Sequence, residues 1–186
     1  MNAELQGYGD QLLSVTQDAV GLMSGLSDAQ FNWQPEPGRW SMAGCFDHLN
    51  KSASVLFVPR IGGAVAAGRA SGPKSDGPFA YSAFERWCVG TNDAPARMKF
   101  KAPRITQPSS HLPVAQVRAE FVKWQDEVAR LLREADGLDL RRIRVASPIP
   151  MLTFSLGTMI RLMLAHERRH TWQAREVRQH RAFPGA

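Results

Sequence analysis

The chain has 186 residues, 44% of them hydrophobic, which is enough for one globular domain with its own core, and we expect a single domain over residues 1–186. No apolar run approaches the length of a membrane span and no secretory signal opens the chain, so we expect a cytoplasmic protein without a membrane partner. The formal charge of +6 comes mostly from arginines that are not interleaved with aromatic residues, which favours a solvated basic face over a nucleic-acid surface.

The first part of the chain contains two predicted helices. Apolar residues recur at helical spacing over residues 3–25, which predicts the first helix. Ser27 then opens a capping-box pattern, and a segment with Pro and Gly separates it from Ser41, which can cap the second helix. We expect the second helix over residues 41–58, with a bend or an end near Pro59.

The middle of the chain is predicted to contain long connections and one short helix. Gly, Pro and Ser make residues 69–80 a loop by composition, and residues 81–89 read as a short helix. Residues 99–110 are expected to be extended or irregular. Residues 114–135 form a strongly amphipathic pattern that predicts the third long helix, which an Asp-Gly pair ends.

A fourth long helix is predicted near the C-terminus. After an irregular segment at residues 138–154, Ser155 can cap this helix, which is expected to reach about His180. Four long helices with connections of varied length predict an all-α protein. The expected architecture is a four-helix bundle with a short extra helix and long loops between the second and third long helices.

The last predicted helix contains the sequence HERRH at residues 166–170. At about 100° per residue, His166 and His170 fall on the apolar stripe of the helix, whereas Arg168 and Arg169 point well away from it. Two histidines four residues apart lie one turn above the other and can bind one metal ion. Two core histidines, each hydrogen-bonded to another group, would leave the same pattern, so a third ligand is needed to decide.

His-Glu-x-x-His is also the zinc-binding motif of a class of metalloproteases, which take their third ligand from a downstream position. Here Gln173 stands where a glycine would turn the chain. Glu176 stands at the last ligand position, but on a straight helix it points about 120° away from His170. These features argue against a metalloprotease, and they require the third ligand to come from another helix.

His48 is the best candidate for that third ligand. It lies in the middle of the second predicted helix, where a core-facing residue is expected. His111, in a loop, and His180, at the frayed C-terminus, are expected to be exposed. Cys45 and Cys88 lack Cys-x-x-Cys spacing, so we expect reduced thiols and neither a disulfide framework nor a cysteine-rich zinc site.

Two segments together resemble the DinB/YfiT-like superfamily of metalloenzymes: LSDAQFNWQPEPGRWSMAGCFDHLNKS at residues 26–52 and SLGTMIRLMLAHERRHTWQ at residues 155–173. The likeness covers the whole chain in order. It implies a four-helix bundle that holds one divalent metal ion, nickel or zinc in most members, on His48, His166 and His170. It also implies thiol-dependent chemistry, in which a low-molecular-weight thiol is transferred to an electrophile or a thiol adduct is isomerised, although many members have no known activity.

Other residues near the histidines have competing interpretations. Glu167 can act as a general base or accept a hydrogen bond from a ligand histidine, but an ion pair with a neighbouring arginine is the commoner role. Asp47 is expected to face solvent, and so is Arg169, which is otherwise a candidate for gripping an anionic substrate. Trp33 and Trp40 are expected to pack at the start of the second helix rather than to contact substrate.

Three classes of function remain open. A three-histidine site leaves a coordination position free, as catalytic sites do, which favours a metal-dependent enzyme acting on a small-molecule substrate. The resemblance favours a thiol transferase, and the site chemistry equally permits a hydrolase. The alternatives are a metal-binding or stress-related protein without catalysis and a basic nucleic-acid binder. A homodimer is the expected assembly.

Overall fold

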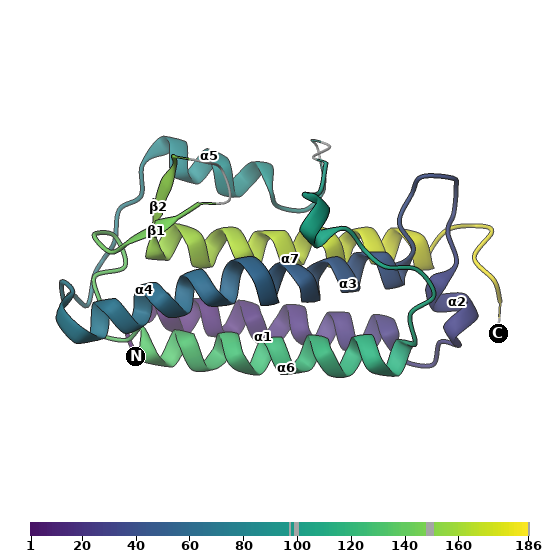
Figure 1. Cartoon of the computed structure of the whole chain (residues 1–186), viewed down its shortest axis with the longest axis horizontal. Helices are drawn as coiled ribbons and strands as arrows, with labels where there is room; N and C mark the ends of the chain where they lie inside the picture. The colour runs from purple at the N-terminus through teal and green to yellow at the C-terminus, as the bar shows by residue number, and fades with distance from the viewer. Residues whose placement is uncertain (97, 99–100, 148–150, 186) are drawn as a thin grey trace.

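Four long helical segments lie side by side along the long axis of the molecule (Figure 1). The computed structural model describes residues 1–96, 98, 101–147 and 151–185. The segments are α1 (Ala3–Met23), α3 (Met42–Ser52) with its continuation, α6 (Val114–Glu134) and α7 (Leu156–Arg178). Both α1 and α3 pack against α6 and α7, which confirms the expected all-α four-helix bundle. No helix in the described part of the chain is both long and apolar enough to cross a membrane.

Side-chain caps begin the helices where the sequence indicates. Ser41 Oγ accepts a hydrogen bond of 3.1 Å from a backbone N–H in the first turn of α3, and Ser155 Oγ accepts one of 3.3 Å in the first turn of α7. Ser27 and Gln30 form the expected capping box, which starts the short helix α2 (Asp28–Asn32). The N-terminal ends of these helices therefore follow from local sequence.

The second bundle helix is longer than expected and changes its winding halfway. After α3 it continues through a π-helical turn, η1 (Ala53–Phe57), into α4 (Val58–Ser71). Pro59 has no N–H to donate to the carbonyl four residues before it and its ring crowds that carbonyl, and the wider π turn lies directly before it. The expected bend or end is therefore a local change of winding, and the loop predicted from residue 69 begins only after Ser71.

The segment between α4 and α6 returns along the bundle next to α7 (Figure 1). It carries α5 (Ala83–Thr91), which matches the short helix expected at residues 81–89, and one 3-10 turn, η2 (Arg104–Thr106). The η2 turn interrupts the irregular structure expected over residues 99–110, of which residues 99 and 100 lie outside the described part. Much of residues 62–90, for which the sequence predicts mainly long connections, is thus helical.

An antiparallel pair of short strands precedes α7, where the sequence predicts irregular structure. The strands are β1 (Arg144–Ala146) and β2 (Thr153–Ser155), with Val145 opposite Phe154. The side chains of this central pair are buried against the core. Strands of three residues contain too little alternation to be recognised from periodicity, so the prediction for residues 138–154 was wrong there. Residues 148–150 lie outside the described part.

Glu85 joins α5 to the start of α7. Its carboxylate accepts hydrogen bonds from the backbone and hydroxyl of Ser82, and from the backbone (3.3 Å) and hydroxyl (2.9 Å) of Ser155. Although burial raises the pKa of Glu85, these hydrogen bonds lower it to about 2. Arg141 and Arg144 lie 3.7 and 3.9 Å from the same carboxylate. These contacts fasten α5 to the N-terminal end of α7.

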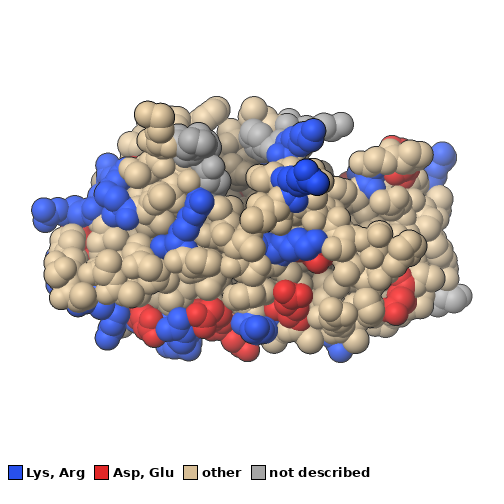
Figure 2. All heavy atoms as spheres, viewed as in Figure 1, with Lys and Arg blue, Asp and Glu red and all other residues tan. Residues whose placement is uncertain are grey.

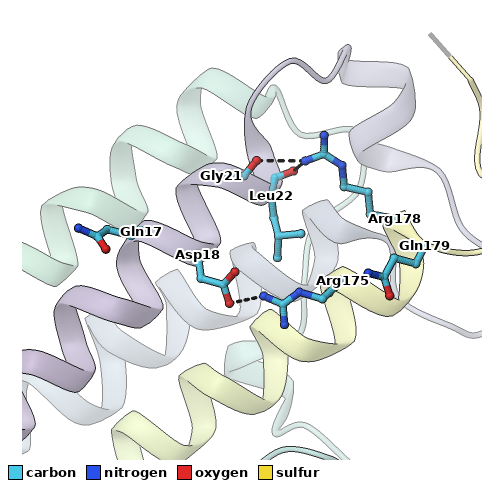
Figure 3. A pocket seen from close by; sticks show the side chains of 7 residues that line it. All are labelled: Gln17, Asp18, Gly21, Leu22, Arg175, Arg178 and Gln179. Carbon is cyan, nitrogen blue, oxygen red and sulfur yellow. Dashed lines mark hydrogen bonds and ion pairs between the residues drawn. The ribbon is translucent and has the colours of Figure 1, made fainter.

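Two arginines near the C-terminal end of α7 hold the end of α1 (Figure 3). Arg178 Nη1 donates to the carbonyl oxygens of Gly21 (3.1 Å) and Leu22 (2.6 Å) in the last turn of α1, where carbonyl groups begin to lack i+4 partners. Arg175 forms an ion pair with Asp18. These contacts hold α1 against α7, and they give two of the arginines of the C-terminal region partners within the protein.

The bundle core is divided into two apolar clusters by a layer of buried polar residues. One cluster contains the N-terminal halves of α1 and α7, the C-terminal half of α6, α4 and the β strands, and the other contains the remaining halves of the bundle helices with α3. Where the clusters meet, the helices contribute His48, Asn50, Gln125, Glu167 and His170, all of them buried. The polar layer therefore lies at the middle of the bundle rather than at its ends.

Candidate metal centre

The structure brings together the three histidines that the sequence predicts as metal ligands. His48 comes from the middle of α3, and His166 and His170 come from successive turns of α7. The ring centroids lie 5.0 Å apart for His48 and His166, and 4.6 Å apart for each of the other two pairs. One ring nitrogen from each residue lies within 4.8 Å of the others, so the group could hold a metal ion.

One pair of nitrogens in this cluster has the spacing of two ligands of one ion. Nε2 of His48 and Nε2 of His166 lie 3.1 Å apart. Two nitrogens bound tetrahedrally to zinc, each at 2.0–2.1 Å, are separated by about 3.3 Å. A hydrogen bond between the His48 and His166 rings would give a similar distance, but it would not explain why the His170 ring lies beside them. A single ion could be held by all three rings.

Burial keeps these imidazoles neutral, as metal ligands must be. Desolvation lowers the pKa of His48 and lowers that of His166 to about 3, with a further contribution from the neighbouring His48 ring. The pKa of His170 is also held well below its usual value by burial. His48 Nδ1 lies 2.7 Å from the carbonyl oxygen of Thr106 and donates to it, which fixes the tautomer and leaves the lone pair of Nε2 facing the cluster.

The aromatic rings of Trp40 and Phe57 pack against different histidines of the cluster. The Trp40 ring lies 4.9 Å from the His48 ring and 5.6 Å from the His170 ring, whereas Phe57 lies 5.5 Å from His166. Gly44 makes room for Trp40, because a Cβ at that position would lie 3.3 Å from Trp40 Cβ. Trp40 therefore does more than pack at the start of α3, since it also covers two of the histidines.

Trp33 packs as expected, and it contacts one of the two histidines outside the cluster, His111 and His180, which differ in their exposure to solvent. The Trp33 ring lies 5.5 Å from His180 and 5.6 Å from Phe183. His180 is therefore half-buried, which contradicts the expected exposure, because the C-terminal residues fold back on Trp33. His111 is exposed as expected and is not part of the cluster.

A large groove opens onto the histidine cluster. Its volume is about 1790 Å³, and it is bounded by α3, η1, α5, α7 and the segment with η2. All three histidines line it, together with Trp40 and Phe57. Small-molecule sites commonly occupy about 300–1,000 Å³, so the groove has room for a substrate of considerable size.

Glu167 points away from this groove into the polar layer. Its Oε1 accepts a hydrogen bond of 3.1 Å from Gln125 Nε2, and Gln125 Oε1 accepts one of 3.2 Å from Thr16. Burial raises the pKa of Glu167 to about 7. The ion pair with a neighbouring arginine that the sequence favours is absent from the described residues. Its catalytic role stays a prediction, and its observed contacts are with α6 and α1.

Two charged residues predicted to face solvent are buried. Arg169 is 5% exposed, and its guanidinium donates to the carbonyl oxygens of Thr91 (3.1 Å) and Met98. Asp47 is 6% exposed and accepts a hydrogen bond of 2.7 Å from the backbone of Ser109. Both predictions were wrong for one reason: the connection from α5 to α6 covers helix faces that a single-helix projection leaves to solvent.

Arg168 also binds this connection. Its guanidinium donates to both carboxylate oxygens of Asp93, at 2.9 and 2.7 Å, and to Gln11 Oε1 at 2.8 Å. The two arginines of HERRH thus hold the segment that follows α5, while the two histidines face the groove. The sequence motif alone gave no sign of this, because the contacts join residues more than 70 positions apart.

The two cysteines are free and are not suited to act as nucleophiles. Both are buried and line the groove. Burial raises the pKa of Cys45 to about 12, and burial and the nearby Glu85 raise that of Cys88. Both therefore remain thiols at neutral pH, in agreement with the expected reduced state.

Comparison with known families agrees with the arrangement of helices and histidines. The model of the DinB superfamily matches residues 11–174, a range that includes His48, His166 and His170. No curated protein and no solved structure is significantly similar to the chain. The match spans most of the four bundle helices, and the chain therefore belongs to the DinB superfamily.

Proposed function

We propose that the protein binds one divalent metal ion, zinc or nickel, on His48, His166 and His170, and acts as a metal-dependent enzyme on small molecules. The observation that carries the proposal is the convergence of three neutral imidazoles, two of them on buried residues and one on a half-buried residue, at the wall of a large groove. A purely structural site would be closed by a fourth protein ligand, and no fourth His, Cys, Asp or Glu joins the cluster among the described residues.

The preferred reaction is transfer of a low-molecular-weight thiol to an electrophile. His48, His166 and His170 would hold the divalent ion, whose positive charge would lower the pKa of a bound thiol or water. The protein's own residues prepare the place for this chemistry. Thr106 holds the His48 ring in one tautomer, and Trp40 and Phe57 pack against the histidine rings.

The thiol of this reaction would come from solution. Cys45 and Cys88 both line the groove, but burial keeps them protonated. A cosubstrate thiol has room to enter, because the groove is larger than one small substrate requires. Hydrolysis would use the same site with water in place of the thiol, so the two reactions differ in their dependence on added thiol.

Metal analysis of purified protein tests the site directly. We expect about one zinc or nickel per chain, and a loss of that metal in His48→Ala, His166→Ala and His170→Ala. His111→Asn is the matched control, because His111 also lines the groove, lies outside the cluster and has a positive φ of 58° that Asn tolerates. Absence of stoichiometric metal, or its persistence in all three alanine variants, would contradict the proposal.

Turnover separates the two reactions. The metal-loaded protein should consume an electrophile such as a halogenated aromatic compound only when a thiol is supplied, and one halide ion and one proton should be released for each thiol that forms a thioether. Product formation that is independent of added thiol would instead identify a hydrolase. A metal-loaded protein inactive with both would favour a metal-binding protein without catalysis.

A further inference from the structure

The groove that contains the histidines is unequal along its length. α3 and α7 run antiparallel, because His48 lies beside His166 and His170 while Trp40 lies beside His170 and Phe57 beside His166. The groove therefore has one end next to Phe57, on the N-terminal side of His166 along α7, and another next to Trp40, on the C-terminal side of His170. From Leu162 to Val177, the lining residues of α7 span about 22 Å.

The end beyond His166 is apolar. Phe57, Phe154 and Leu162 contribute its inner wall and are 2–7% exposed. Trp87, which is 60% exposed, extends the wall to the surface of α5. Such a wall can cover an aromatic or branched apolar group.

The remainder of the groove is positively charged. Four residues with formal charge line the described part of the groove: the anion Glu36 and the cations Arg39, Lys101 and Arg169. The ion pairs between described residues involve neither Arg39 nor Lys101. Figure 2 shows Lys and Arg side chains gathered around the segment that carries η2. A divalent ion on the histidines would add further positive charge.

We infer that the groove takes an amphipathic organic anion, with its apolar group on the Phe57–Leu162 wall and its carboxylate, sulfonate or phosphate near Arg39 and Lys101. This inference rests on the proposed function, because it treats the groove beside the metal as the substrate site. It narrows the substrate class, since neutral polar molecules would leave the apolar wall in water and cationic molecules would meet charge of the same sign.

Two fluorescent probes that differ by one sulfonate test the inference. They are 8-anilinonaphthalene-1-sulfonate and the uncharged N-phenyl-1-naphthylamine, titrated into the metal-loaded protein. We expect the sulfonate probe to bind more tightly, and Arg39→Gln and Lys101→Gln each to weaken it about 2–5-fold while leaving the uncharged probe unchanged. Trp87→Ala should weaken both probes by a similar factor, because it removes apolar wall common to both.

Matched controls separate the groove from the rest of the surface. Arg104→Gln removes an exposed cation that does not line the groove, and Ile105→Ala removes an apolar side chain that is 69% exposed and also lies outside it. Neither should change the affinity of either probe. The inference is overturned if the Arg39→Gln/Lys101→Gln double variant binds the sulfonate probe as tightly as the unchanged protein, or if Arg104→Gln weakens it equally.

Metal content measured on the same samples distinguishes this inference from the proposed function. Full metal without a preference for the sulfonate probe overturns the inference and leaves the metal site standing. A preference for the sulfonate probe in protein that cannot be loaded with metal overturns the proposed function and leaves the ligand class of the groove standing.

Discussion

The Nδ1 atom of His48 lies 2.7 Å from the carbonyl oxygen of Thr106, so a ring of α3 is held by the η2 turn of a segment 58 residues further along the chain. This bond links the geometry of the histidine cluster to the connection that covers it. The link runs both ways, because the His48 ring also gives the Thr106 carbonyl, on a buried residue, its hydrogen-bond partner.

His48→Asn should separate the two roles of this ring. An asparagine amide can take the position of Nδ1 and donate to Thr106, but it has no atom at the position of Nε2. We expect metal affinity to fall by more than about 100-fold in both His48→Asn and His48→Ala. Hydrogen exchange of residues 101–110 should rise only in His48→Ala, and equal exchange in the two metal-free variants would contradict this role for Thr106.

Glu85 should make the stability of the fold depend on acid pH. Its pKa in the folded protein is about 2, below its ordinary value of 4.5. A carboxyl whose pKa is depressed by folding contributes stability above its unfolded pKa, and this stability is lost as the pH falls from about 4.5 towards 2. Each pKa unit corresponds to about 1.4 kcal/mol, so the contribution at pH 7 is about 3 kcal/mol.

Urea unfolding of Glu85→Gln at several pH values measures this contribution. The variant should be less stable than the unchanged protein at pH 7, and the difference should shrink as the pH falls from 4.5 to 2.5. A difference that is independent of pH would show that the loss comes from packing rather than from the charge of the carboxylate.

Gly157→Ala should damage the junction of α1, α5 and α7. A Cβ at residue 157 would lie 1.9 Å from Tyr81 Oη, which donates a hydrogen bond of 2.5 Å to Glu4. The tyrosine must move, and we expect a loss of about 2–4 kcal/mol in the free energy of unfolding from crowding and from the broken hydrogen bond. Gly63→Ala is the control, because a Cβ there meets nothing within 4 Å and should stabilise α4 by up to about 1 kcal/mol. Similar melting temperatures for the two variants would contradict the prediction.

Arg168 and Asp93 should be coupled in a double-mutant cycle. Their bidentate pair is half-exposed, with side-chain exposures of 34% and 31%, so we expect a coupling energy of about 1 kcal/mol that decreases at high salt. Either single alanine variant should also speed hydrogen exchange at residues 91–96, because the pair holds this segment to α7. Additive effects of the two substitutions would show that the pair contributes nothing beyond its separate residues.

The sequence predicts those features that depend on one helix at a time. The caps at Ser41 and Ser155 and the inward direction of His166 and His170 follow from local pattern, because each is set by the residues within one or two turns. His48 could be selected because its position on the second helix also faces the core. The distances between the three rings could not be predicted in this way. They depend on how α3 packs against α7, and sequence periodicity contains no information on the distance between two helices.

Several features that sequence reasoning missed depend on contacts with the connection between α5 and α6. Arg169 and Asp47 look like surface residues on their own helices, and they are buried because the segment after α5 lies over them. The role of Trp40 was missed for a related reason, because its ring contacts histidines of two helices. A basic residue between two inward histidines is a signal that could have been used, since a charge so close to a buried site needs a partner.

The π-helical turn at η1 has a consequence for how insertions and deletions act on this chain. One extra residue in a turn rotates everything after it by about 100° relative to an uninterrupted α-helix. The buried face of α4 is therefore offset from the face that α3 would bury if the two were one regular helix. This offset allows His48 to face α7 while Ile61 and Val65 still enter the core. Deleting one residue within Ala53–Phe57 would join α3 and α4 into one regular α-helix. Either His48 or the pair Ile61 and Val65 would then turn towards solvent.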